Sequence, residues 1–179
     1  ALEGHLSGSR NIAIGSDAMD GTGAGGTTGA ASTDNVALGS YALGGAWTDA
    51  QSDHNVAIGT SAMGGALANV DGSVAIGSSA LASLTDGSKN IAIGYDALGD
   101  CIEGDQNIAI GYEALNAMVG ETGESNVGHD NIAIGTDSMG SVNAGGHASA
   151  SSNNNIAIGS NALLGGAFSS TEVLTGNIA

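Results

Sequence analysis

Four acidic residues recur at one position of this chain, each two residues after a glycine: Asp17, Asp96, Glu113 and Asp137. If copies of that position stack on one another, their carboxylates supply the oxygen ligands that Ca²⁺ prefers. Other copies of the position hold Tyr41, Ser61, Ser79 and Asn161. A solvated edge is therefore the alternative interpretation. The four acids are weak calcium candidates, and no other metal or cofactor is expected.

The remaining reactive side chains do not combine into a catalytic pattern. A second acidic set, which precedes the apolar segments, is explained by Asx turns: Asp34, Asp53, Asp71 and Asp130. The histidines share no metal-ligand spacing and are expected in loops: His5, His54, His129 and His147. Cys101, the single cysteine, has no consistent histidine partner and is expected to be a spacer thiol. The chain is accordingly predicted not to be an enzyme.

Isolated aromatic residues are the candidates for contact with a target. Tyr41, Trp47 and Phe168 lie in or beside spacers, where they either contact a carbohydrate or receptor or anchor a loop to the body of the protein. Tyr95 and Tyr112 occupy the same position in neighbouring copies of a repeated sequence motif, so their rings are expected to stack.

All of these residues are positioned by one short repeated sequence motif, which we call the phrase. It reads Asn, Ile or Val, Ala, Ile or Leu, Gly, two variable residues, a small residue, then Leu or Met, and it starts at Asn11, Asn35, Asn55, Ser73, Asn90, Asn107, Asn131, Asn155 and Asn177. A constant phrase with spacers of variable length predicts a solenoid, in which each coil keeps one core segment and its loop lengthens outward. We therefore expect an N-terminal flank over residues 1–10 and one repeat domain over 11–179, with eight full repeats and a truncated ninth.

The phrase alternates with the period of a β-strand, as in Ile12-Ala13-Ile14. The Ile or Val pair is expected to fill the interior against the Leu or Met, which a second short strand carries. A middle residue that is always Ala predicts a face that meets another copy of the chain. The expected assembly interface is Ala13, Ala37, Ala57, Ala75, Ala92, Ala109, Ala133 and Ala157. The glycine is expected to adopt positive φ, and the asparagines are expected to form a ladder between coils.

Composition excludes several classes of function. The formal net charge is −16, and Arg10 and Lys89 are the only strong cations, so nucleic acid is not expected as a partner. No apolar run reaches the length of a membrane span, so this segment is not expected to insert into a membrane. A lyase built on a β-helix needs a basic or carboxylate cluster on one sheet, and two cations make that class improbable.

The phrase resembles the YadA-like head repeat of trimeric autotransporter adhesins, whose signature is close to Asn-Ser-Val-Ala-Ile-Gly. It is also similar to the Asn-x-Ala-Ile-Gly-Tyr-x-Ala-Leu repeats of phage tail fibres, most closely over residues 90–98 and 107–115. The resemblance covers about residues 11–179. It implies an all-β, left-handed parallel β-roll, a β-solenoid packed side by side as a homotrimer, and a role in surface attachment. The spacers are longer than in adhesin heads, and coiled-coil heptads and an anchor are missing, so the kind of host stays open.

The expected function is that of an extracellular, structural and adhesive fibre segment that mediates attachment to a host cell or surface. A bacterial surface adhesin and a phage tail fibre are both compatible with the sequence. The expected partners are other copies of the chain and a host receptor or glycan. The alternative is a subunit of a self-polymerising extracellular filament or coat.

Overall fold

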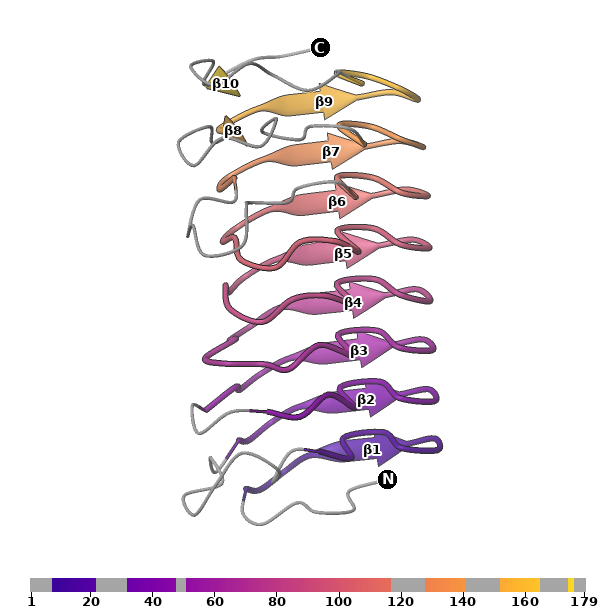
Figure 1. The fold of residues 1–179 in the computed structure, drawn as a ribbon, viewed down its shortest axis with the longest axis vertical. Helices are drawn as coiled ribbons and strands as arrows, with labels where there is room; N and C mark the ends of the chain where they lie inside the picture. The colour runs from indigo at the N-terminus through magenta and orange to yellow at the C-terminus, as the bar shows by residue number, and fades with distance from the viewer. Residues whose placement is uncertain are drawn as a thin grey trace.

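The computed structural model describes residues 8–21, 32–47, 51–116, 128–140, 152–164 and 174–175. These residues form an all-β parallel β-solenoid, and no helix occurs among them. Figure 1 shows the strands stacked one above another along the long axis, from the N-terminal to the C-terminal end. The solenoid that the repeat predicts is therefore confirmed.

Each repeat contributes one three-residue strand to a single sheet. The strands are β1 (Ile12–Ile14), β2 (Val36–Leu38), β3 (Val56–Ile58), β4 (Val74–Ile76), β5 (Ile91–Ile93), β6 (Ile108–Ile110), β7 (Ile132–Ile134) and β9 (Ile156–Ile158). They form one 8-stranded parallel sheet in the order β1-β2-β3-β4-β5-β6-β7-β9. A separate two-stranded sheet pairs β8 (Ser152–Asn153) with β10 (Leu174–Thr175).

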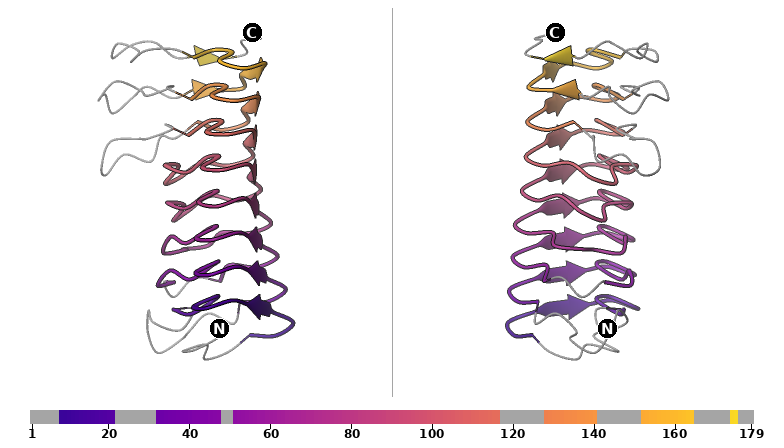
Figure 2. Two further views of the ribbon diagram at one scale, coloured as in Figure 1. Left: turned by 90° about the vertical axis from the view of Figure 1, so that its right-hand side faces the viewer. Right: turned by 60° about the vertical axis from the view of Figure 1, so that its left-hand side comes forward.

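The register of the sheet places equivalent residues of the repeat directly over one another. Ala75 pairs with Ala92, and Ala92 pairs with Ala109, so each alanine lies above the alanine of the preceding coil. The sheet occupies one side of the column and the turns project from the other (Figure 2). Any residue type that repeats in the phrase therefore becomes a continuous column along the molecule.

The strand alanines face the interior of the single chain, which corrects the predicted orientation of the strands. Seven of the eight are fully buried: Ala37, Ala57, Ala75, Ala92, Ala109, Ala133 and Ala157. Ala13 is partly buried and packs against the same core. The alanines are therefore not available on the surface of the chain, and the prediction that they form an interface between copies is wrong.

The width of the solenoid explains this orientation. The Leu or Met of each repeat is buried in the core that contains the strand alanines, as Leu98 and Leu115 illustrate. Two large side chains facing each other do not fit in so thin a layer, because protein interiors are packed to near-crystal density. Alanine opposite leucine fills the space, and the Ile or Val pair is left on the outer face.

A tight turn, and not the predicted second strand, carries the Leu or Met. Gly94 has a φ of 136°, and Leu98, four residues later, has a φ of 51°. A Cβ atom added to Gly94 would lie 2.2 Å from the carbonyl oxygen of Gly111 in the next coil. Glycine is thus required both by its positive φ, as predicted, and by the close approach of the next coil.

A ladder of buried asparagines joins the coils on the N-terminal side of the strands, as predicted. The Asn35 Oδ1 accepts a hydrogen bond from the backbone N–H of Asn55 at 2.9 Å, and its Nδ2 donates to the Ser52 carbonyl at 2.9 Å. Ser73 replaces asparagine in one coil, and its Oγ accepts from the Asn90 N–H at 3.1 Å. Each rung satisfies backbone groups that would otherwise be buried without partners.

Candidate functional site

The outer face of the 8-stranded sheet carries two parallel columns of aliphatic side chains, which we call the aliphatic face. The first column is Ile12, Val36, Val56, Val74, Ile91, Ile108, Ile132 and Ile156, and the second is Ile14, Leu38, Ile58, Ile76, Ile93, Ile110, Ile134 and Ile158. All are exposed or half-buried in the single chain, and Ile58, in the interior of the sheet, is 39 % exposed. A contiguous apolar surface of this kind marks an interaction site.

Sequence reasoning missed the aliphatic face because it assigned the Ile and Val pair to the interior. The signal was nevertheless present. Every strand of the 8-stranded sheet has a β-branched or leucine residue at both outer positions, although a solvent-facing strand position normally accepts polar residues. Apolar residues on both faces of a strand indicate, as expected from the sequence, that both faces are covered, but they do not say which face points outward.

A second distinctive surface lies at the opposite end of each strand from the asparagine ladder. We call it the turn edge and define it by the two residues that follow the strand glycine. The first turn position holds Ser16, Ser40, Thr60, Ser78, Tyr95, Tyr112, Thr136 and Ser160, and the second holds Asp17, Tyr41, Ser61, Ser79, Asp96, Glu113, Asp137 and Asn161. Every residue at the second position has a positive φ between 50° and 60°. This conformation directs the chain back toward the core within one short turn.

Tyr95 and Tyr112 stack on the turn edge, as predicted. Their ring centroids are 5.3 Å apart with an interplanar angle of 12°, and each side chain is about half exposed. The Tyr112 hydroxyl is hydrogen-bonded to Glu113, and this bond, with the nearby negative charges, raises the pKa of Tyr112 to about 12. The Tyr112 hydroxyl therefore stays un-ionised in a negative environment.

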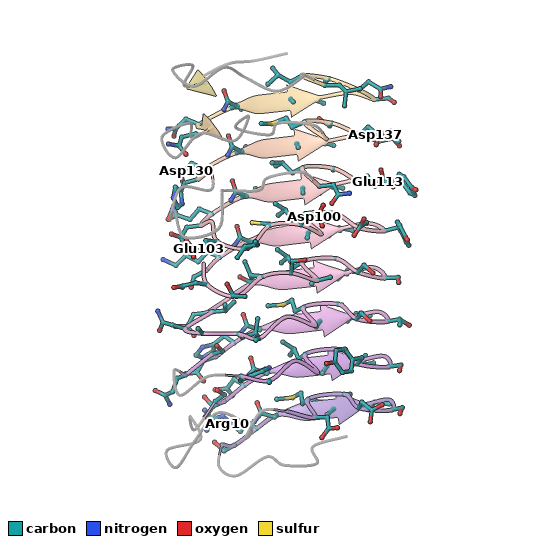
Figure 3. The ribbon with its side chains drawn as sticks, in the orientation of Figure 1. Arg10, Asp100, Glu103, Glu113, Asp130 and Asp137 are labelled. Carbon is teal, nitrogen blue, oxygen red and sulfur yellow. The ribbon has the colours of Figure 1, made fainter. Side chains whose placement is uncertain are left out.

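Carboxylates of the second turn position surround the tyrosine stack. Figure 3 shows Glu113 and Asp137 at this edge on neighbouring coils, whereas Arg10, Glu103 and Asp130 lie at the opposite edge. Desolvation, the charge of Asp100 and the charge of Glu113 raise the pKa of Asp96, against a hydrogen bond from Asn116. Three successive coils of the turn edge thus place a carboxylate beside or next to the tyrosine stack.

The four calcium candidates do lie in one column of the turn edge, but the structure does not bring them together as a group. Asp17 is separated from Asp96 by three coils, while Asp96, Glu113 and Asp137 follow one another. In the described ranges no group of three or more His, Cys, Asp or Glu side chains is placed to hold a metal ion. The geometry therefore supports no calcium site.

The second acidic set serves contacts between coils in place of the predicted local Asx turns. Asp53 accepts from the Thr33 N–H at 2.6 Å, and Asp71 accepts from the Asp53 N–H at 2.7 Å. Asp34 binds the Arg10 guanidinium through both carboxylate oxygens at 2.6 Å. That hydrogen bonding, opposed in part by desolvation, holds the pKa of Asp34 below its ordinary value.

Asp130 and the two described histidines belong to the same set of contacts. Asp130 accepts from the Gln106 amide at 2.9 Å, and the His129 Nδ1 accepts from the Asp105 N–H at 3.0 Å. His54 is exposed, with its Nε2 3.7 Å from Asp34. His5 and His147 lie outside the described residues. These polar groups stabilise the stack and do not assemble into a reactive site.

The three predicted receptor contacts have different outcomes. Tyr41 is 44 % exposed, and its ring lies against the backbone of Gly44 and Gly64. Trp47 is 1 % exposed, so the prediction that it contacts a receptor from the surface is wrong, and the alternative of an anchor in the core is confirmed. Phe168 lies outside the described residues.

Cys101 is a core residue. Its side chain is fully buried, and burial, followed by the charges of Asp105 and Glu103, raises the pKa of the thiol to about 12. A thiol that resists ionisation is a poor nucleophile. It packs in the core together with Leu84 and Leu98.

In the part of the chain that the structure describes, no helix has the length and apolar character needed to cross a membrane.

Comparisons with known proteins do not place this chain in a family. No known protein family, no curated protein and no solved structure matches the chain. The chain is therefore assigned to the parallel β-solenoid architecture and to no family.

Proposed function

We propose that this chain is a structural and adhesive segment of an extracellular fibre, in which copies of a left-handed β-roll pack side by side as a homotrimer through the aliphatic face. The resemblance of the repeat to YadA-like heads supports the left hand and the trimer. The aliphatic face is the single observation that carries the proposal.

The energetics of that face favour a partner. Burying an Ile or Val side chain completely is worth roughly 1.5–3 kcal/mol, and each coil presents two such side chains that are exposed or half-buried. The pair is repeated on eight strands, so the gain from covering it accumulates along the whole face. Left in water, the same face would promote aggregation.

The regularity of the face favours another copy of the chain as that partner. Its side chains repeat once per coil, at the inter-strand distance of about 4.8 Å. A second copy presents columns with the same repeat, so the side chains of the two faces interdigitate along the whole length. Because every strand contributes equally, the assembly extends over the entire column, as a fibre segment requires.

Outward-facing lysine substitutions test the proposed assembly. Ile58→Lys places a charge in the middle of the aliphatic face, and the matched control Thr60→Lys places the same charge two residues away on the exposed turn edge. We expect the wild type and Thr60→Lys to sediment as trimers, and Ile58→Lys to sediment as a monomer that keeps its β circular dichroism. A wild type that sediments as a monomer, or an Ile58→Lys variant of trimeric mass, contradicts the proposal.

A self-polymerising filament is the second candidate. Within the described residues, β1 pairs only with β2 and β9 pairs only with β7 in the main sheet, so each end of that sheet presents a strand with one neighbour. Such an edge accepts a further strand. Electron microscopy separates the two candidates, since the fibre segment gives rods of one defined length and the filament gives rods of indefinite length.

A further inference from the structure

We infer that the tyrosine stack and the carboxylates of the turn edge form a docking surface for an arginine- or lysine-bearing segment of a partner protein. The surface comprises Tyr95, Tyr112, Asp96, Glu113 and Asp137, and we call it the tyrosine–acid surface. The surface specifies the chemistry of a target for the proposed attachment role. Binding at this surface does not require that role; only the biological significance of the binding rests on the proposed function.

Each ring of the stack is about half exposed. Backbone hydrogen bonds from Asp96 to Ser78 and from Asp137 to Tyr112 continue the strand register into the turn. Ser78 and Thr136 therefore flank the two-ring stack along the column. Their side chains are too short to cover an aromatic ring, which leaves one face of each ring available at the two ends of the stack.

An organic cation matches those faces. The face of an aromatic ring attracts ammonium and guanidinium groups, and a planar guanidinium also stacks on it. At the Tyr112 end, Glu113 follows Tyr112 in the same turn, and Asp137 occupies the equivalent position of the next coil, where its N–H donates to the Tyr112 carbonyl. A cation placed on Tyr112 is thus offered a π face and two carboxylates at once.

The chain itself supplies no cation to this surface. Arg10 and Lys89 are its only strong cations, and each directly precedes the asparagine that leads into a strand, so both lie at the opposite edge of the column from the turns. Arg10 is also held by Asp34. The negative charge around the tyrosines is consequently not neutralised within the chain, and a basic partner is electrostatically complementary to it.

The shape of the surface favours a protein segment over a small molecule. Small ligands are held in concave pockets that enclose most of their surface, whereas these residues lie on a row of turns, with the two tyrosines about half exposed and the three acids partly buried. An extended basic segment that runs along the row engages the carboxylates of successive coils, which repeat at about 4.8 Å.

The test is a binding titration of the full chain, at near-physiological salt, with a blocked peptide carrying three arginines. Tyr95→Ser/Tyr112→Ser removes both rings at constant charge and installs the residue that occupies the same position at Ser40 and Ser78. We expect this variant to lose about tenfold in affinity. The peptide with glutamine in place of arginine is expected not to bind.

A charge-matched pair separates docking from general attraction to an acidic protein. Glu113→Gln/Asp137→Asn removes two charges at the surface and is expected to lose about tenfold, while Asp86→Asn/Glu103→Gln removes two charges elsewhere and is expected to stay within about twofold. Equal losses in the two pairs, or unchanged affinity in the tyrosine variant, overturn the inference. Sedimentation and circular dichroism of each variant show whether assembly or folding has changed, which distinguishes failure here from failure of the fibre proposal.

Discussion

At the scale of single residues, the structure depends on small side chains and amides that satisfy the backbone between coils. Four buried ladder asparagines both accept and donate a hydrogen bond across the gap to the next coil: Asn35, Asn55, Asn90 and Asn107. Removing such a side chain leaves backbone groups without partners in a region that excludes water. The ladder is therefore expected to contribute more to stability than its polarity suggests.

Asn107 provides the test of the ladder. Its Oδ1 accepts from the Asn131 N–H at 3.0 Å and its Nδ2 donates to the Gly128 carbonyl at 2.9 Å. We expect Asn107→Ala to lower the free energy of unfolding by roughly 2–4 kcal/mol, measured by chemical denaturation. Asn107→Ser, which can accept as Ser73 does for Asn90, is expected to lose about half as much. Equal stability of Asn107→Ala and the wild type would falsify a structural role for the ladder.

At the scale of the repeat, the turn adopts left-handed backbone conformations where the sequence offers no glycine. Besides the strand glycine, each coil has a residue at the second turn position and a Leu or Met with φ near +50°, such as Ser79 at 60° and Leu81 at 53°. This region costs an L-residue about 1–2 kcal/mol. Burial of the Leu or Met offsets that cost at one position, but nothing comparable offsets it at Ser79, which is only partly buried.

A glycine pair tests the strain in the turn. Ser79→Gly relieves the left-handed conformation and is expected to raise the free energy of unfolding by about 0.5–1 kcal/mol. Ser83→Gly, in the same coil but with ordinary backbone dihedrals, is expected to lower it by a similar amount because glycine adds entropy to the unfolded chain. Thermal melts monitored by circular dichroism measure both, and a loss of stability in Ser79→Gly contradicts the assignment of strain.

At the scale of the whole molecule, each strand of the main sheet pairs, among the described residues, with strands of adjacent coils alone, and the end strands β1 and β9 have one such partner each. Stability in such a stack is close to a sum over coils and their interfaces. The long spacers therefore change the surface without changing the stack, and the aliphatic face and the turn edge keep their spacing along the column.

Removal of one complete coil tests this independence. Deleting residues 90–106 joins Lys89 to Asn107 and places β4 beside β6. In the intact chain β4 and β6 both pair with β5 in the same register, so they can pair with each other in that register. We expect a folded, cooperative solenoid that has lost about one eighth of its unfolding enthalpy in calorimetry. Deleting only residues 90–98, which takes the strand and turn but leaves the spacer, is expected to disrupt the stack. If both deletions behave alike, the coils are not the unit of stability.

The sequence by itself determined the repeating architecture and several of its details. Alternation around Ala92 predicts a strand, the invariant Gly94 predicts a positive φ, the asparagines predict a ladder, and the spacing of Tyr95 and Tyr112 predicts their stacking. These features follow from local conformational preference and from the period of the repeat, so no knowledge of tertiary packing is needed to infer them.

Only the tertiary structure decided which face of the strand points inward. Alternation is unchanged when a strand is turned over, so Ile91-Ala92-Ile93 is equally consistent with either orientation. The thickness of the coil makes the choice: leucine and methionine already occupy the core, and the strand can add only a methyl group. The same packing buries Trp47 and holds Leu98 in a left-handed turn, which no local propensity predicts. The aliphatic face, on which the proposed assembly depends, is thus a product of the width of the interior.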